Sequence, residues 1–201
     1  MTKTIGSILG VAALAACTTA SAGVTGSLGG GSGTFLALSS AGLAGGSVAT
    51  LAGGTVYTSD QPFADIPKGT VTDFLAVGVQ AGEPATLTFT TPVSDLSFLW
   101  GSPDLYNLLT IVSTDITQMF TVMDLGFGVT NGNQAFSQYV QFASAPGSRI
   151  TGVIFNNTPA NDAFEVANFS VAAVPESSTF ALLAAGLGVI GLVVRRRRRV
   201  A

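Results

Sequence analysis

The sequence predicts an all-β domain, a single antiparallel β-sandwich of the jelly-roll type, between residues 55 and 173. Three observations carry this prediction. Short runs rich in Val, Thr, Phe and Leu recur along this part of the chain, Gly, Pro, Asn and Asp interrupt them, and no segment has a long amphipathic helical pattern. Roughly eight short strands at such intervals are typical of an antiparallel sandwich.

The clearest strand is Ala85–Thr90, in which Leu87 and Phe89 alternate with threonines. Strict alternation predicts a strand with one face in the core and the other face polar. The same composition predicts further strands at 70–79, 96–100, 108–113, 119–124, 136–143, 149–155 and 164–171. Turn-forming residues separate these runs, as in Gly82-Glu-Pro and Asn131-Gly-Asn.

Residues 23–54 are of low complexity and rich in Gly, Ser, Thr and Ala, as in Gly29-Gly-Gly-Ser-Gly33. Such a segment loses much conformational entropy on ordering and has few side chains to pack. We expect a loosely ordered arm, with one edge strand around Thr34 to Leu38.

The N-terminal residues 1–22 have the three parts of a secretory signal peptide. Lys3 gives a positive charge, residues 5–16 are apolar, and Ala20-Ser21-Ala22 forms a cleavage site before Gly23. An alternative is that Leu14-Ala15-Ala16-Cys17, which resembles a bacterial lipobox, directs lipidation of Cys17. We expect conventional cleavage, because the other end of the chain already supplies an anchor.

That C-terminal anchor occupies residues 174–201. Its parts are the short motif Val174-Pro175-Glu176-Ser177, an apolar helix at 179–194, and the block Arg195, Arg196, Arg197, Arg198 and Arg199. An apolar helix can enter a bilayer because it satisfies its own backbone hydrogen bonds. The arginines would stay on the cytoplasmic side, so the rest of the chain is expected outside.

This tripartite tail resembles the PEP-CTERM sorting signal that exosortases process in Gram-negative bacteria. The resemblance implies an exosortase-type membrane transpeptidase as partner, with cleavage near Pro175 and Glu176 and retention by the arginines. It also implies anchoring in the inner membrane before processing and delivery to the cell surface or extracellular matrix afterwards. Ser177 stands where that family usually has a second proline. The alternative is an ordinary single-pass membrane anchor.

Composition excludes several classes of chemistry. The chain has no histidine, and its one cysteine, Cys17, precedes the expected cleavage site. Ser-His-Asp and Cys-His nucleophile pairs and His- or Cys-ligated zinc are therefore excluded. Between residues 23 and 174 two basic residues stand against ten acidic ones, a net charge of -8. We expect no nucleic-acid partner, because an acidic surface repels phosphates.

Two further segments carry a second resemblance. Leu99-Trp-Gly-Ser-Pro-Asp-Leu-Tyr-Asn-Leu-Leu-Thr110 resembles a W-G-S-x-D-x-Y-N-x-L signature of exosortase-dependent surface proteins. The segment Asp162-Ala-Phe-Glu-Val-Ala-Asn168 is similar to one that precedes the tail in the same family. This resemblance implies a surface protein and no particular activity.

The residues Trp100, Asp104, Tyr106 and Asn107 are the candidate binding residues. An aromatic face that stacks on a sugar, together with carboxylate and amide groups, would suit a carbohydrate-binding module for exopolysaccharide. The competing interpretation makes Trp100 and Tyr106 core anchors around a turn in which Asp104 and Asn107 bond the local backbone. We favour the second interpretation, because a binding function needs the aromatic rings to point outward.

No cofactor and no catalytic residue are predicted. A structural calcium ion remains an option at two groups of oxygen-bearing side chains, neither with EF-hand spacing. These are Asp60 with Asp65, and Asn156, Asn157, Asn161 with Asp162. A glycoside hydrolase could work with paired carboxylates, but no spacing designates an acid and a base. The sequence thus predicts a non-enzymatic, exported protein with a structural or adhesive role in the envelope or exopolysaccharide.

Overall fold

The computed structural model describes residues 23–173, which form one antiparallel sheet of twelve strands. Helical structure in this range is limited to one turn of 3-10 helix, η1 (Ala44–Gly46), and one of α-helix, α1 (Val122–Leu125). The strands are β1 (Val24–Leu28), β2 (Leu38–Ser39), β3 (Gly42–Leu43), β4 (Ala49–Ala52), β5 (Thr55–Tyr57), β6 (Phe74–Val77), β7 (Ala85–Gly101), β8 (Asn107–Ser113), β9 (Thr117–Thr121), β10 (Ser137–Ser144), β11 (Ile150–Asn157) and β12 (Phe164–Ala173). The prediction of an antiparallel all-β domain is confirmed.

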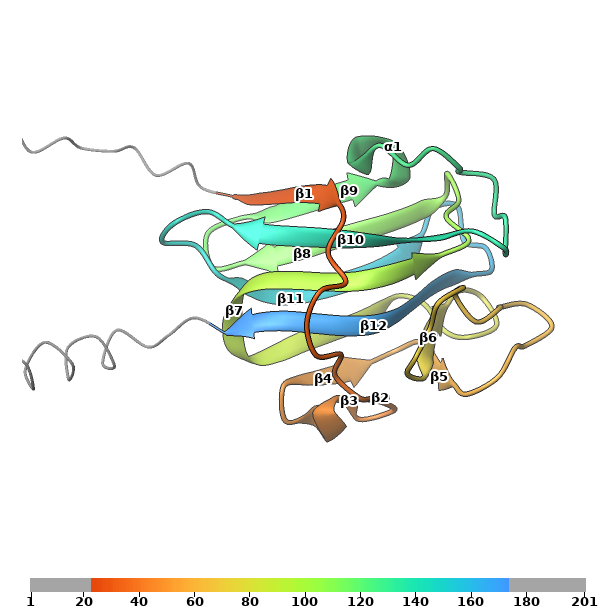
Figure 1. Ribbon diagram of the computed structural model, residues 1–201, viewed down its shortest axis with the longest axis horizontal. Coiled ribbons are helices and arrows are strands. Elements are labelled where there is room, and N and C mark those ends of the chain that lie inside the picture. The colour runs from red at the N-terminus through yellow and green to blue at the C-terminus, as the bar shows by residue number, and fades with distance from the viewer. Residues whose placement is uncertain (1–22, 174–201) are drawn as a thin grey trace, which may run out of the picture.

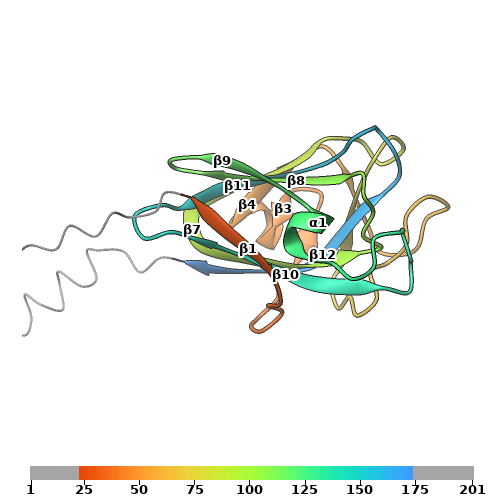
Figure 2. The ribbon, with the colours of Figure 1, turned by 90° about the horizontal axis from the view of Figure 1, so that it is seen from above.

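The long strand β7 belongs to two layers at once. Its first part, around Leu87, pairs with β4 and β11, and the sheet continues through β8 to β9. Its second part, around Phe98, pairs with β10 and β12, which pair in turn with β1 and β6. The sheet therefore folds over at the middle of β7, and Figure 2 shows the two layers from above.

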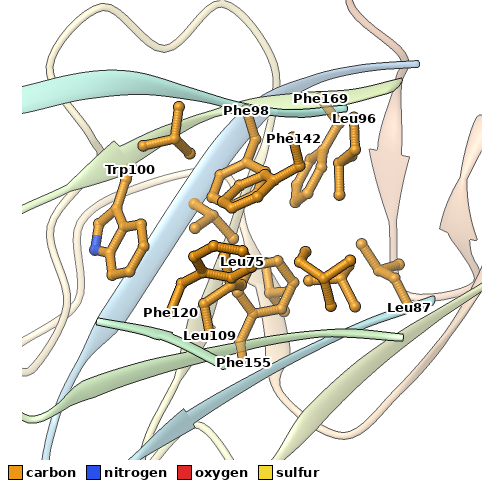
Figure 3. Packing of buried hydrophobic residues seen from close by; sticks show 14 of the residues in the cluster. Leu75, Leu87, Leu96, Phe98, Trp100, Leu109, Phe120, Phe142, Phe155 and Phe169 are labelled. Carbon is orange, nitrogen blue, oxygen red and sulfur yellow. The ribbon is translucent and has the colours of Figure 1, made fainter. Parts of the chain in front are cut away.

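The core lies between these layers and is rich in aromatic residues. Phe98 of β7 contacts Phe155 of β11 edge-on, with ring centroids 5.4 Å apart, and Phe142 of β10 contacts Phe120 of β9 at 5.2 Å. Figure 3 shows side chains of the two layers facing one another. Each of these rings removes a large apolar area from water, which is the main stabilising contribution in a domain without a disulfide framework.

Several predicted strands are confirmed. Leu87 and Phe89 are buried while Thr88 and Thr90 are exposed, so the predicted alternation marks a half-buried strand. β8, β10, β11 and β12 match predicted strands to within a few residues. These runs are long enough, and their apolar residues regular enough, for local pattern to determine the structure.

Three predicted boundaries are wrong. The strand expected at 70–79 is the shorter β6, Phe74–Val77. The strands expected at 85–90 and 96–100 are one strand, β7, in which Pro92 has no ladder partner. Proline cannot donate a ladder hydrogen bond, so it is tolerated where the strand passes between layers. The strand expected at 119–124 ends at Thr121. Thr121 caps α1 and forms a capping box with Asp124, and this local hydrogen bonding outweighs the strand pattern.

The loosely ordered arm predicted at 23–54 is a further correction. β1 pairs along its whole length with β10, and β4 pairs with β7. The edge strand expected at 34–38 is reduced to β2, which pairs with β3. Gly26 shows why a small residue is required in β1. A Cβ at this position would lie 2.8 Å from both Leu125 and Phe142, so only glycine lets β1 lie this close to the core. The sandwich thus begins with β1 rather than at residue 55.

The predicted signal peptide at 1–22, including Cys17, lies outside the described residues. The tail, with Val174, Pro175, Glu176, the helix at 179–194 and the arginines 195–199, also lies outside them. Among residues 23–173 no helix is long and apolar enough to span a membrane.

Candidate functional site

The candidate segment Trp100–Asn107 connects β7 to β8 at the pole of the domain opposite to Gly23 and Ala173 (Figure 1). Ser102 N–H donates to the carbonyl of Phe136, and Asp104 forms an isolated bridge with Asn131. The segment is thus held against the connection that leads into β10.

Trp100 is fully buried, with 0% of its surface exposed. Its ring stacks on Phe164 of β12 with centroids 4.3 Å apart and meets Phe127 edge-on at 5.3 Å. Figure 3 shows its side chain among the core residues. A sugar has no access to this ring, so the assignment of Trp100 to a carbohydrate site is corrected, and its interpretation as a core anchor is confirmed.

Asn107 is also buried and makes hydrogen bonds in three directions. Its Oδ1 accepts from Trp100 Nε1 at 3.3 Å and from the Asp104 N–H at 2.8 Å, and its Nδ2 donates to Asn157 Oδ1 at 2.9 Å. Asn157 Nδ2 in turn donates to the carbonyl of Val77. Asn107 therefore joins β7, β8, β11 and β6, and its polar atoms are occupied within the protein.

Tyr106 and Asp104 lie at the surface of this pole, partly buried. The Tyr106 hydroxyl donates to the carbonyl of Asp162 at 2.8 Å. Burial, and then the neighbouring Asp104 carboxylate, raise the pKa of Tyr106 above its ordinary value. Its phenol is therefore a hydrogen-bond donor at neutral pH and not a base. Tyr106 is not the core anchor that the second interpretation expected.

The two segments that resemble the surface-protein signature lie side by side. Trp100 pairs with Val166 and Gly101 with Glu165, as neighbouring positions of β7 and β12. Asn168, at the end of the second segment, donates from Nδ2 to the carbonyl of Gly69 and to the Tyr139 hydroxyl. Ser102, Asn107 and Asn168 of these segments therefore have structural partners.

Glu165 is a buried acid that the sequence analysis did not single out. Only 3% of its surface is exposed, and this burial raises the pKa of its carboxyl to about 8. The Ser102 hydroxyl donates to its Oε2, and the backbone N–H of Asp65 donates to the same carboxyl. The one available signal was an acid within the apolar run Phe164–Ala167.

Members of both groups of oxygen ligands considered for calcium accept hydrogen bonds within the domain. Asp60 Oδ1 accepts from the Ile66 N–H at 2.8 Å. The Asp162 carboxylate accepts from both the backbone and the side-chain amide of Gln80, at 3.0 and 2.9 Å. Within residues 23–173, no three side chains of the Asp, Glu, His and Cys types gather where they could hold a metal ion.

No protein-family model matches this chain, and no curated protein or solved structure matches it.

Proposed function

We propose that this chain is an exported surface or matrix protein, delivered by an exosortase-type sorting system, with a structural or adhesive role in the envelope or exopolysaccharide. In this proposal residues 1–22 direct export, a jelly-roll-like β-sandwich is the cargo, and residues 174–201 form the sorting signal. The observation that best supports it is the placement of the two ends of the domain.

Both ends of the domain lie at the same pole (Figure 1). β1 begins at Val24, opposite Ser144, and the Gly23 carbonyl accepts from the Ala145 N–H at 2.9 Å. β12 ends at Ala173, opposite Val93, where β7 passes between the layers. A domain whose two ends share one pole can be held at a membrane by either end, with its opposite pole facing outward.

The first and last strands of the domain lie close in sequence to the proposed processing sites. β1 begins two residues after Ala22, and β12 ends one residue before Val174. Five residues separate Ala173 from the proposed membrane helix at 179, a connection that reaches at most about 20 Å when extended. Pro175 and Glu176 would therefore lie between the folded domain and the bilayer, within reach of a membrane enzyme.

The structure of the domain is compatible with release from the membrane. Its core closes between two layers and contains no cysteine, so it needs neither a disulfide nor the membrane to bury its apolar face. Its ten acidic residues against two basic ones keep it soluble in an extracellular setting. The alternatives for its anchoring are lipidation at Cys17 and a permanent single-pass anchor.

The intact mass and the location of the protein in its producing cell test this function. Wild type should lose residues 1–22 and a C-terminal piece that contains the arginines. Glu176→Ala, or deletion of residues 195–199, should leave a heavier, membrane-retained form. Ser178→Ala is the matched control just outside the motif and should mature normally. If both motif variants mature to the mass and location of wild type, the sorting function is wrong.

A further inference from the structure

A groove of about 660 Å³ lies on the outer face of the layer formed by β1, β10, β7 and β12. Residues 29–36, which we call the strap, connect β1 to β2 and run across this face (Figure 1). Figure 2 shows the same segment standing outside the layer. Strap and strands together enclose a concave site of the size that small ligands and segments of polymers use.

The floor of the groove consists of two rows of small or polar side chains, one residue from each strand. Neighbouring strands are about 4.8 Å apart, so a row of four spans roughly 14 Å. One row is Ser27, Gln141, Ser97 and Ser170, and the other is Thr25, Ala143, Asp95 and Ala172.

The strap is fixed on the sheet by backbone hydrogen bonds at both of its ends. The Gly29 N–H donates to the carbonyl of Tyr139, and the Leu36 N–H donates to the carbonyl of Phe169, both at 2.8 Å. Between them the Gly31 N–H donates to Ser97 Oγ at 3.1 Å. A Cβ on Gly31 would lie 2.7 Å from the Tyr139 ring, and Gly31 has a φ of +72°. Glycine is needed for this close approach, and the groove is preformed.

Several side-chain oxygens of the groove have no hydrogen-bond partner among residues 23–173. They are the hydroxyls of Thr25, Ser32, Thr34 and Ser170 and the Oδ1 of Asp95. The backbone groups of β7 and β10 are engaged in ladders on both sides. A ligand in the groove would therefore be recognised by side-chain hydroxyls and a carboxylate, and not by adding a strand to the sheet.

The charge of the groove selects the ligand class. Lys68 and Arg149 are the basic residues of the described part, and neither lines the groove. An anionic ligand would meet Asp95 without a compensating cation, which is unfavourable. Hydroxyl groups both donate and accept, so they match a neutral ligand that is itself rich in hydroxyls.

We propose that this groove binds a segment of a neutral polysaccharide, with Asp95 accepting from hydroxyls of the sugar. This site is separate from the buried Trp100 segment. The inference deepens the adhesive role proposed above and rests on that role for the source of the ligand. Binding itself is measured on the purified chain, so a failure of the sorting experiment and a failure of this one are distinguishable.

The test uses the full chain in a zwitterionic detergent without a sugar headgroup. Fluorescently labelled dextran, galactomannan and soluble β-glucan are the neutral probes, labelled polygalacturonate is the anionic probe, and anisotropy is the readout. At least one neutral probe should bind and polygalacturonate should not. Ala143→Leu combined with Ala172→Leu fills the floor with side chains that cannot hydrogen-bond, and should weaken binding about tenfold or more.

Two further variants make this test specific. Asp95→Asn keeps the shape of the side chain but removes its charge, and should weaken binding by roughly three- to tenfold. Ala135→Leu, at an exposed position of the connection into β10 that does not line the groove, is the matched control and should bind like wild type. The inference is overturned if no neutral probe binds, if polygalacturonate binds equally well, or if the double leucine variant binds as tightly as the control.

Discussion

The indole Nε1 of Trp100 donates a hydrogen bond to Oδ1 of Asn107, at 3.3 Å, inside the domain. Both residues are buried, and a buried indole N–H needs such a partner. The same Asn107 amide donates to Asn157. The pair thus connects the end of β7, the start of β8 and the end of β11 without a charged group.

We expect Asn107→Ala to lower the free energy of unfolding by about 2–4 kcal/mol, because it leaves Trp100 Nε1 and Asn157 Oδ1 buried without partners. Asn133→Ala is the matched control, since the exposed Asn133 Oδ1 bonds only the nearby Ala135 N–H. That change should cost less than about 1 kcal/mol. Urea unfolding of both variants checks the difference, and equal losses would show that the buried amide does not stabilise the domain.

The alternation in β7 gives a second stability prediction. Phe89→Ala should lower the free energy of unfolding by about 3–5 kcal/mol, because it removes a core aromatic ring and leaves a cavity. Thr88→Ala changes the exposed neighbour and should cost within roughly 0.5 kcal/mol. Chemical denaturation of the two variants is the measurement, and similar losses at both positions would contradict a half-buried strand.

An element of this fold could be predicted from the sequence where local interactions determine it, and could not be where its partners are distant in sequence. The strand at Ala85–Thr90 was predictable because alternation is a local pattern. The continuation of β7 past Pro92 was not, since the partners that hold its two parts lie on β11 and β12. The hydrogen-bond partners of the buried Glu165 are Ser102 and Asp65, which are distant in sequence. The groove depends on the strap crossing four strands, and no local pattern specifies that crossing.

The glycine-rich segment at 23–54 is ordered, contrary to what its composition predicts. Low complexity predicts disorder because small side chains bury little area. In β1, however, the small side chain is what the packing requires, because Gly26 lies against Leu125, Phe142 and Phe120. The aromatic neighbours supply the buried area that the glycine lacks.

A substitution at Gly26 tests this packing. Gly26→Ala should lower the free energy of unfolding by about 1–3 kcal/mol, because the added methyl group overlaps the side chains beneath it. Gly128→Ala is the control, since a Cβ there would meet nothing within 4 Å, and it should leave stability within roughly 1 kcal/mol of wild type. If the alanine at 26 is as harmless as the one at 128, β1 does not pack as described.

The N-terminal processing site gives a prediction that does not involve the free energy of unfolding. Cleavage after Ala22 would leave Gly23 first and no cysteine in the mature protein, whereas lipidation would leave a modified Cys17 as the first residue. We expect Cys17→Ser to be processed normally, with Gly23 at the N-terminus by mass spectrometry of the terminal peptide. Accumulation of the unprocessed Cys17→Ser chain would instead establish the lipoprotein alternative.

Glu165 should make the stability of the domain depend on pH. Its pKa is about 8 in the folded protein against an ordinary value of 4.5, so the folded state holds a proton that the unfolded state has released. The stabilisation is complete below pH 4.5, decreases as the pH rises through the interval to 8, and is lost above it. The slope contributed by one such proton is about 1.4 kcal/mol per pH unit. Urea unfolding between pH 5 and 9 measures this decrease.

Glu165→Gln keeps the size of the side chain and cannot ionise, so most of the decrease between pH 5 and 8 should disappear in this variant. Asp115→Asn is the matched control. The hydroxyls of Ser148 and then Ser113 hold the pKa of Asp115 below its ordinary value, so its titration lies outside this interval. The control should therefore keep the slope of wild type, because Asp115 carries its charge in the folded and the unfolded state throughout. A slope that persists unchanged in Glu165→Gln would mean that the buried carboxyl does not hold its proton at neutral pH.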